Sequence, residues 1–404
     1  MTESAISQPV SGPSSSVDLF GDEVLADPYP AYAELRALGP AVYVERINAW
    51  VLPRYDSVKA ALLDPETFSS VNGLHLNPEG NQWVTAGSVL AADGLEHARL
   101  RRVLSKQLAP RAIRDLGDSL RARADELVVS LAGRDSFDAV SDLAAPYVTG
   151  VILELMGLPH VDGSGLVKQV ESVFNTFAAP NPRVYEGLPA AQAMFEFLQT
   201  VATRDNVSPD SWLGAAHAAA DRGEIAEIEC VMTMAAYTTA GMDTTIHAIA
   251  TAVQMLTSDR EQWELVRDGK VSYEALFGET LRYDAPIQGF GRRVMRETTV
   301  GDSTIPEGAQ VWLMFGSSGR DEAKWGAEAD VFDIRRPDAA DQLALGFGTH
   351  LCAGNHLALM EFDAVFGALA RHFPGLAPDP AAPPTRVLNN VLRIWDRVNV
   401  LTRP

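Results

Sequence analysis

The ten residues Leu345-Gly-Phe-Gly-Thr-His-Leu-Cys-Ala-Gly354 decide the fold of this chain. Glycines at 346 and 348 let the backbone turn sharply and approach a flat ligand closely. Cys352 stands just before an apolar-periodic segment, residues 355–372, which we predict to be a helix. Because a helix N-terminus has free N–H groups and a positive partial charge, it favours a thiolate and donates hydrogen bonds to sulfur. A lone cysteine in such a place is usually part of the core, so the spacing of its neighbours has to indicate the function.

That spacing resembles the haem-binding signature of the cytochrome P450 family, Phe-Gly-x-Gly-x-His/Arg-x-Cys-x-Gly. The departure is Leu345, where the family usually has Phe, so we expect a difference in reduction potential or haem packing but the same ligand. The resemblance implies haem b, with Cys352 as the axial ligand of its iron. It also places three residues of the loop beside the haem: Phe347, Gly348 and Gly354. The other cysteine, Cys230, lies in no such context and is predicted to be a core residue.

The fold implied by this resemblance is mainly α with minor β. It has a triangular helical body, a long central helix over the haem and a small β-rich region. The sequence pattern agrees with this. Residues 225–257 are apolar on nearly every face, which predicts one buried helix of roughly 50 Å. A membrane span is disfavoured there by Glu227, Glu229 and Asp243. Short strands are predicted at residues 298–300 and 310–314.

Domain organisation is expected to be simple. Residues 1–16 are rich in Ser, Pro and Gly, and we expect them to be a disordered tail. No composition shift follows, so residues 17–404 are expected to form a single domain. The start of the chain lacks both a basic cluster and an apolar run, which argues against a signal peptide or a membrane anchor.

Charge and cysteine content narrow the functional classes. The chain has 53 acidic and 33 basic residues and a formal charge of −20, so nucleic acid and anionic membranes are disfavoured as partners. Two cysteines do not make a disulfide framework, which indicates a reducing compartment. We therefore expect a cytoplasmic protein.

The segment Glu279-Thr-Leu-Arg282 resembles the family's Glu-x-x-Arg helix. Residues at i and i+3 share a helix face and can form an ion pair. Such a pattern means little alone, but its place upstream of Cys352 supports the structural role implied by the family. Arg335 is the expected partner of this pair.

The segment Ala240-Gly-Met-Asp-Thr-Thr245 resembles the family's oxygen-activation motif. Gly241 is expected to let dioxygen fit against the backbone beside Ala240. The Thr244 hydroxyl is expected to bond back to a carbonyl one turn earlier and widen the helix groove. The resemblance assigns proton delivery to Thr244 and Asp243. The alternative is an ordinary Gly and Thr pair that bends a buried helix.

Four cations are expected to bind the haem propionates. His97-Ala-Arg-Leu-Arg101 resembles the family's His-x-x-x-Arg pair, whose members project together at i and i+4. Arg292 and His350 occupy the other propionate-binding positions. Each of them alone would be read as a surface cation.

The substrate pocket resembles that of bacterial P450s that oxidise para-substituted benzoates, typically by O-demethylation. The shared residues are Val173-Phe-Asn-x-Phe177, Pro286-x-Gln288 with Phe290, and Asn389-Asn390. Aromatic rings make flat apolar walls suited to one aromatic substrate. The expected substrate contacts are Phe174, Phe177, Val84, Ala236, Ala240, Ile287, Phe290 and Val391. The alternative is that these residues are simply core.

The polar residues that hold the carboxylate in those relatives are missing. Alignment on Trp83 puts Val84 and Gly87 at two of their positions, and Ala235 and Ala236 stand at the other two. A buried carboxylate without a partner costs several kcal/mol. We therefore expect a small neutral aromatic substrate, best a methoxyphenol such as a 4-alkylguaiacol, demethylated to a catechol and formaldehyde. Gly289 and Gly291 are expected to leave extra room.

Other functions remain open. They are oxidation of 4-methoxybenzoate-type acids, hydroxylation of a terpene or another neutral hydrophobe, haem sensing or storage without turnover, and peroxide-driven catalysis. Asp243 and Thr244 argue against the last two. O2 is the expected oxidant. Electrons are expected from a ferredoxin and an NAD(P)H-dependent ferredoxin reductase, because no flavin or nucleotide motif is present. The basic run Arg101, Arg102, Lys106 and Arg111 is either their docking patch or a solvated helix face. The family default is a monomer.

Overall fold

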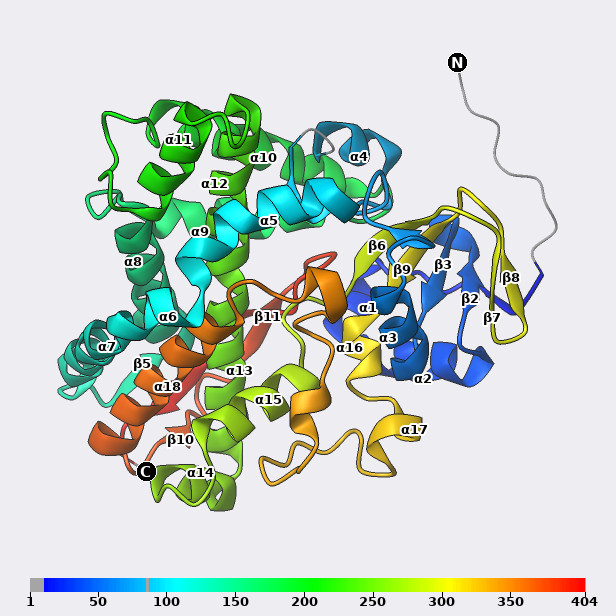
Figure 1. Cartoon of the computed structure of the whole chain (residues 1–404). Helices are drawn as coiled ribbons and strands as arrows, with labels where there is room; N and C mark the ends of the chain where they lie inside the picture. The colour runs from blue at the N-terminus through cyan, green and yellow to red at the C-terminus, as the bar shows by residue number, and fades with distance from the viewer. Residues whose placement is uncertain (1–10, 85–86, 404) are drawn as a thin grey trace.

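The computed structural model describes residues 11–84 and 87–403, except for the side chains of Trp83, Val84 and Ser164. A large helical body occupies one side of the molecule and a β-rich region the other (Figure 1). The expected fold class, mainly α with minor β, is confirmed. The helices are α1 (Asp22–Ala26), α2 (Tyr29–Leu38), α3 (Tyr55–Leu63), α4 (Pro78–Val84), α5 (Gly94–Leu108), α6 (Pro110–Ile113), α7 (Gly117–Leu131), α8 (Ala145–Met156), α9 (Ser164–Asn175), α10 (Pro182–Thr200), α11 (Trp212–Asp221), α12 (Glu227–Gly241), α13 (Asp243–Ser258), α14 (Arg260–Arg267), α15 (Tyr273–Tyr283), α16 (Phe315–Ser318), α17 (Glu322–Trp325) and α18 (Asn355–His372).

The strands form one larger sheet and three small ones. The larger sheet has the order β1-β2-β3-β9-β6-β4, in which β3 and β9 run parallel (Trp50 opposite Val311). The small sheets are β10-β13-β5, β11-β12 and β7-β8. The strands are β1 (Ser14–Ser15), β2 (Val42–Val44), β3 (Ala49–Leu52), β4 (Phe68–Ser69), β5 (Ser136–Asp138), β6 (Phe290–Val294), β7 (Thr298–Val300), β8 (Ser303–Ile305), β9 (Gln310–Leu313), β10 (Ala377–Pro378), β11 (Thr385–Val387), β12 (Ile394–Arg397) and β13 (Asn399–Leu401).

The end of the expected disordered tail needs a correction. Residues 1–10 lie outside the described part of the chain. Within residues 11–16, however, Ser14 pairs in parallel with Tyr43, and the Tyr43 amide donates to the Pro13 carbonyl at 2.9 Å. The edge of β2 has free backbone groups that even a short polar segment can satisfy, so composition alone placed the boundary too late.

The expected long helix is two helices in sequence, α12 and α13, which run through the helical body (Figure 1). They are separated at Met242, whose dihedrals are φ −97° and ψ −77°. The Thr244 hydroxyl donates to the Ala240 carbonyl at 3.0 Å, which confirms the predicted bond across the break. A hydroxyl inserted beside the backbone ladder in this way commonly bends a helix.

Two further features concern the core. Most residues of α13 are buried, as the apolar pattern predicts. Among the described residues one stretch, 139–156, is long and apolar enough to cross a membrane, but 56% of it is buried inside the molecule. A core helix of this kind passes the same test by length and composition.

Candidate active site

The thiolate loop places Cys352 between a 3-10 turn at residues 348–350 and the start of α18. Gly346 and Gly348 adopt left-handed backbone angles, φ +71° and +67°, where a side chain would be strained. The Cys352 amide donates to the Leu345 carbonyl at 2.8 Å. The Gly354 amide donates to the sulfur, as predicted, and with the Arg101 charge it lowers the pKa of the thiol, while the larger effect of burial raises it.

The two cysteines differ as expected. The Cys352 side chain is exposed, although the groups around it are dense enough to raise the pKa of its thiol. Cys230 is fully buried, and burial raises the pKa of its thiol to about 11. Among the described residues, no three His, Cys, Asp or Glu side chains gather as a metal site. Cys352 can therefore ligate a metal whose remaining ligands come with a cofactor.

Three of the four expected propionate cations lie close together, namely His97, His350 and Arg101. The rings of His97 and His350 lie 4.3 Å apart, and Nε2 of buried His97 has no partner in the described structure. Burial, with the nearby His350 and Arg101 charges, lowers the pKa of His97 to about 4. Arg292 is buried, and among the described residues no carboxylate lies within 4 Å of its guanidinium. Burial lowers its pKa to about 10. Asp93 is the carboxylate that acts on this cluster, and it bonds to His350, so His97 Nε2 and the Arg292 guanidinium remain to hold haem propionates.

Other residues around this cluster have different contacts. His350 Nε2 lies 2.8 Å from Oδ1 of Asp93, a carboxylate that sequence reasoning missed. Arg101 donates to the Leu351 carbonyl at 2.5 Å, next to Cys352. The Lys59 ammonium lies 4.9 Å from the ring centre of Phe347.

The Glu-x-x-Arg pair forms a closed network. Arg282 donates to both carboxylate oxygens of Glu279, at 2.7 and 2.8 Å, and both side chains are fully buried. The same guanidinium also donates to three carbonyls of the meander, those of Gly319, Ala329 and Val331. A buried ion pair of this kind needs such extra bonds to offset its desolvation.

The prediction that Arg335 is the partner of that pair is wrong. Arg336 is the residue that approaches Glu279, with Nε 3.4 Å from Oε2. Arg335 is held at the surface because Asp333 Oδ1 accepts from its backbone amide and from its Nε, while Glu261 binds its Nη1.

The carboxyl group of Asp243 is fully buried at the start of α13, and neither of its oxygens has a partner among the described residues. Burial raises its pKa well above the usual range, and the nearby Glu171 carboxylate adds to the shift. Burial therefore favours the neutral, protonated form of this acid. Gly241 faces α8, because a Cβ there would lie 3.0 Å from Cδ1 of Ile152. The glycine therefore permits close packing of α12 on α8, and its expected contact with dioxygen stays a prediction.

A cavity of about 850 Å³, counted to its mouth, opens between the 75–90 segment, α9, α10 and α12. Phe177, Ala235 and Ala236 line it, and Val173 lies beside them. The described lining residues include no Lys or Arg. The other lining residues are His75, Asn77, Glu79, Gly80, Ser88, Leu90, Thr176, Leu188, Ala191, Met194, Phe195, Met232 and Thr239.

Three of the expected aromatic contacts form one cluster. The Phe177 ring lies 5.7 Å from the rings of Phe174 and Phe290. Phe177 lines the cavity, and the rings of Phe174 and Phe290 pack against it. Ala240 is exposed one turn after Ala236 on α12.

Other expectations about the pocket need correction. Val391 is fully buried in the core, and its carbonyl accepts from the Gln288 amide at 2.8 Å. Ile287 is only half-buried but bridges to Leu392 rather than lining the cavity. The Val84 side chain lies outside the described part.

The glycines of β6 do not leave extra room. A Cβ at Gly289 would lie 2.4 Å from Nε1 of Trp312, and one at Gly291 would lie 2.3 Å from the Gly73 carbonyl. Neighbouring groups already fill the space, so these glycines permit close packing.

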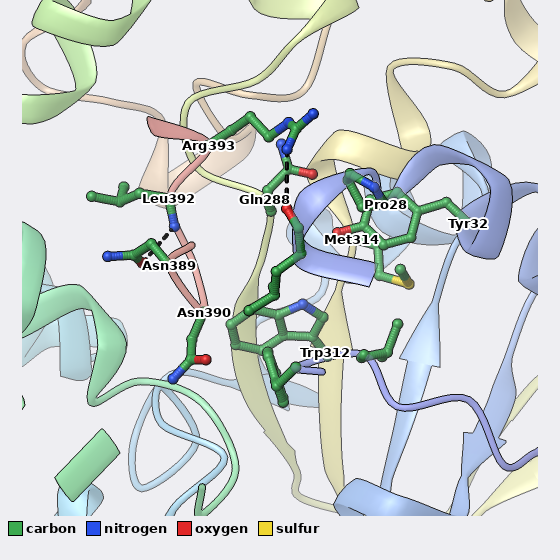
Figure 2. Close-up of a pocket in the computed structure, with 12 residues that line it drawn as sticks. Pro28, Tyr32, Gln288, Trp312, Met314, Asn389, Asn390, Leu392 and Arg393 are labelled. Atoms are coloured by element: carbon green, nitrogen blue, oxygen red, sulfur yellow. Dashed lines mark hydrogen bonds between the residues drawn. The ribbon is translucent and has the colours of Figure 1, made fainter. Parts of the chain in front are cut away.

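Asn389 and Asn390 hold the β11–β12 loop against α9. Asn389 donates to the Glu171 carbonyl at 2.7 Å, and Asn390 donates to the Asn175 carbonyl at 3.0 Å. They border a small second pocket with Gln288 and Trp312 (Figure 2). None of its described lining residues belongs to the thiolate loop or to α12 and α13, so it is separate from the candidate active site.

Sequence reasoning missed two residues near the cavity. His75 is a buried histidine in an irregular loop, and its stacking on Phe177 (ring centres 4.1 Å apart) has no local sequence signal. Glu171 lies on α9, far from Asp243 in sequence, and only the packing of α9 on α13 brings the two carboxyl groups together.

One residue of the basic run, Arg101, lies near Cys352, and the other three are at the surface. Arg102, Lys106 and Arg111 are exposed, and Arg101 reaches the backbone beside Cys352. Lys106 is partly neutralised by Glu224, 3.5 Å away.

Comparisons with known proteins agree with this geometry. The model of the family Cytochrome P450 matches residues 273–394. The chain is 32% identical to cytochrome P450 CYP199A2 of Rhodopseudomonas palustris, covering 97% of this chain and 95% of that protein. It is 30% identical to nocardicin C N-oxygenase of Nocardia uniformis, covering 91% of this chain and 93% of that one. Among solved structures, cytochrome P450 CREJ in complex with (4-ethylphenyl) dihydrogen phosphate is similar with a TM-score of 0.82 and 30% identity, covering 93% of this chain and 97% of that chain.

Proposed function

The chain belongs to the cytochrome P450 family, and we propose that this monooxygenase O-demethylates a small neutral methoxyaromatic compound of the 4-alkylguaiacol type. The observation that carries the proposal is the cavity beside α12. Its described lining combines a flat aromatic wall at Phe177 with small and apolar side chains, and it has no Lys or Arg to pair a carboxylate. An aromatic ring gains from such a wall, whereas a buried unpaired carboxylate costs several kcal/mol.

Haem b is the cofactor of this family, and the residues of this chain fit it. We propose that Cys352 ligates the iron and that His97, Arg101, Arg292 and His350 hold the propionates. The unpartnered His97 Nε2 and the buried, carboxylate-free Arg292 support this assignment. When bound, the haem supplies the site at which dioxygen is activated.

The remaining steps belong to the protein. The net reaction converts methoxyarene, O2, two electrons and two protons to phenol, formaldehyde and water. We propose that neutral Asp243 supplies protons to the dioxygen side of α12 and that Thr244 positions their path, its hydroxyl being held on the Ala240 carbonyl. Phe177 and Ala236 orient the ring, and the packed wall behind Phe177 excludes water from it.

Two relatives bear on the substrate. The solved relative CREJ is in complex with a 4-ethylphenyl phosphate, a para-alkylated ring, which supports a similar ring here. Nocardicin C N-oxygenase has comparable identity and a name that describes a different reaction, so identity at this level does not decide the substrate. The substrate class is therefore inferred from the residues that line the cavity.

P450s of this kind use redox partners. We propose a ferredoxin and its NAD(P)H-dependent reductase for this chain, docking on the exposed cations near Cys352, in a monomeric cytoplasmic enzyme.

The test uses the purified holoenzyme with a ferredoxin system. The substrates are 2-methoxy-4-propylphenol, 4-methoxybenzoate and a monoterpene. We expect high-spin binding and formaldehyde release with the first. Binding and demethylation of 4-methoxybenzoate alone would replace our proposal with acid oxidation. A hydroxylated terpene without formaldehyde from any methoxyarene would replace it with hydroxylation.

A further inference from the structure

His75 lines the cavity, and its Nε2 is a buried nitrogen without a hydrogen-bond partner among the described groups. The residue is 2% exposed. A buried polar atom without a partner is rare in a folded protein, and in a ligand cavity it indicates a group that a ligand satisfies.

The protonation of the ring follows from its other nitrogen. Nδ1 lies 3.0 Å from the Thr176 carbonyl oxygen, which can only accept, so Nδ1 carries a hydrogen and donates it. Burial lowers the pKa of His75 to about 4, although the Thr176 carbonyl raises it slightly. The imidazole is therefore neutral at pH 7, and Nε2 presents a lone pair that can only accept.

The ring is held firmly in place. The Asn81 side chain accepts from the His75 amide at 2.9 Å and donates to the His75 carbonyl at 2.7 Å. The imidazole stacks on Phe177, with ring centres 4.1 Å apart and planes inclined by 13°. Leu76 donates to the Phe177 carbonyl at 2.9 Å, which fixes the same loop to the same wall. An acceptor positioned in this way loses little freedom when a ligand binds.

Four other polar groups of the cavity wall already have internal partners, and the remaining one, the Glu79 carboxylate, belongs to an exposed residue. Thr176 and Thr239 donate their hydroxyls to carbonyls on their own helices, at 2.7 and 2.8 Å. Ser88 Oγ accepts from the Leu90 amide, and Asn77 Oδ1 accepts from the Glu79 amide. His75 Nε2 is thus the buried acceptor that remains for a ligand among these groups.

We propose that His75 Nε2 accepts a hydrogen bond from a hydroxyl group on the aromatic ring of the substrate and thereby selects phenols. This inference rests on the proposed function, whose substrate it narrows. In a 2-methoxyphenol the hydroxyl and methoxy groups are on neighbouring ring carbons, so anchoring the hydroxyl also fixes the position of the methoxy group. An ionised benzoate has no proton to donate and meets a lone pair, so the same nitrogen disfavours it.

The experiment compares two ligands that differ only in the hydroxyl. Wild-type holoenzyme is titrated with 2-methoxy-4-propylphenol and with 1-methoxy-3-propylbenzene, and the haem difference spectrum gives each Kd. We expect the phenol to bind about tenfold tighter, the effect of one satisfied buried acceptor. Equal affinities would overturn the inference, since a bound water would then satisfy His75.

Two variants locate the effect. His75→Phe keeps the stacked ring and removes the acceptor, so the affinity ratio is expected to fall to about one through weaker phenol binding. Phe177→Leu alters the same wall but keeps the acceptor, so both affinities should fall together and the ratio should persist. A His75→Phe protein that keeps the full ratio would contradict the proposal. If His75→Phe does not retain haem, the affinity ratios of His75→Gln and of the wild-type protein are compared instead.

Failure of the proposed function would look different. Wild-type enzyme that releases no formaldehyde from either compound loses the O-demethylase assignment. The inference is then read from a second pair without methoxy groups, 4-propylphenol against propylbenzene. Tighter binding of the phenol would support a hydroxyl-accepting His75, and equal binding would overturn it.

Discussion

Oε1 of Glu171 on α9 lies 3.7 Å from Nε2 of His247 on α13. His247 follows Asp243 by one helical turn, so the two share a helix face. Both oxygens of Asp243 are buried and have no partner among the described residues, while the Glu171 side chain is 22% exposed. Because the Glu171 charge also acts on Asp243, we expect Glu171 to link the buried acid to solvent. Arg386 and Asp284 are the other charges that act on His247.

Asp243→Asn is expected to lower kcat for demethylation roughly 100-fold, a typical loss for one general acid. Substrate Kd should stay the same, because the cavity lining does not include Asp243. Glu171→Gln should give a smaller loss of roughly threefold to tenfold, with an increased solvent isotope effect, because water still reaches this surface. Turnover with normal isotope effects in both variants would exclude the path.

Asp243→Asn should also change the pH dependence of stability. Burial raises the folded-state pKa of Asp243 above its unfolded value, so its relative contribution to stability is present below the unfolded pKa and is lost as pH rises through the folded pKa. Because Asn does not ionise, the variant lacks the destabilisation that a buried ionised carboxylate causes at higher pH. Its free energy of unfolding should gain on wild type by about 1.4 kcal/mol per pH unit between the two pKa values. Chemical unfolding of the holoenzyme between pH 4 and about pH 8 measures it. A constant difference would show that Asp243 is ionised.

Two adjacent arginines give a matched test of the Glu279 network. The Arg336 side chain is 11% exposed and its Nε lies 3.4 Å from Glu279, so Arg336→Ala should cost about 1–3 kcal/mol. Arg335 is exposed and bonded to Asp333, so Arg335→Ala should change stability by less than about 0.5 kcal/mol. Urea unfolding of both variants checks this. A larger loss of stability in Arg335→Ala than in Arg336→Ala would show that Arg335 is the partner of the Glu279 network.

This pair also shows what sequence can predict. The thiolate loop, the Glu-x-x-Arg pair and α18 were predictable because their signals are local in sequence. Whether Arg335 or Arg336 reaches Glu279 depends on which of these two arginines Asp333 binds. His75 and Glu171 act through packing between distant segments, and Gly289 and Gly291 have a role that only their three-dimensional neighbours reveal. Pocket contacts are therefore the least predictable part of the site.

Charge reversal tests the docking surface. Arg102→Glu should raise the KM for ferredoxin about tenfold at low salt, and the effect should shrink as salt is added. Lys106→Glu should do less, because Glu224 already neutralises part of that charge. Lys270→Glu, an equally exposed change beyond α14, is the control and should leave KM alone. Equal effects at all three positions would indicate a response to net charge rather than docking.

Arg292→Leu separates haem binding from folding. Without haem the buried guanidinium has no carboxylate within 4 Å among the described residues, and burial lowers its pKa to about 10. Replacing it with an apolar side chain should leave the apoprotein equally stable or stabilise it. In the holoenzyme the same change removes a cation from a propionate, so haem should dissociate about tenfold faster. Haem transfer to apomyoglobin and unfolding of the apoprotein measure the two effects. If the apoprotein lost stability while haem stayed bound, Arg292 would be a structural residue and would not hold a propionate.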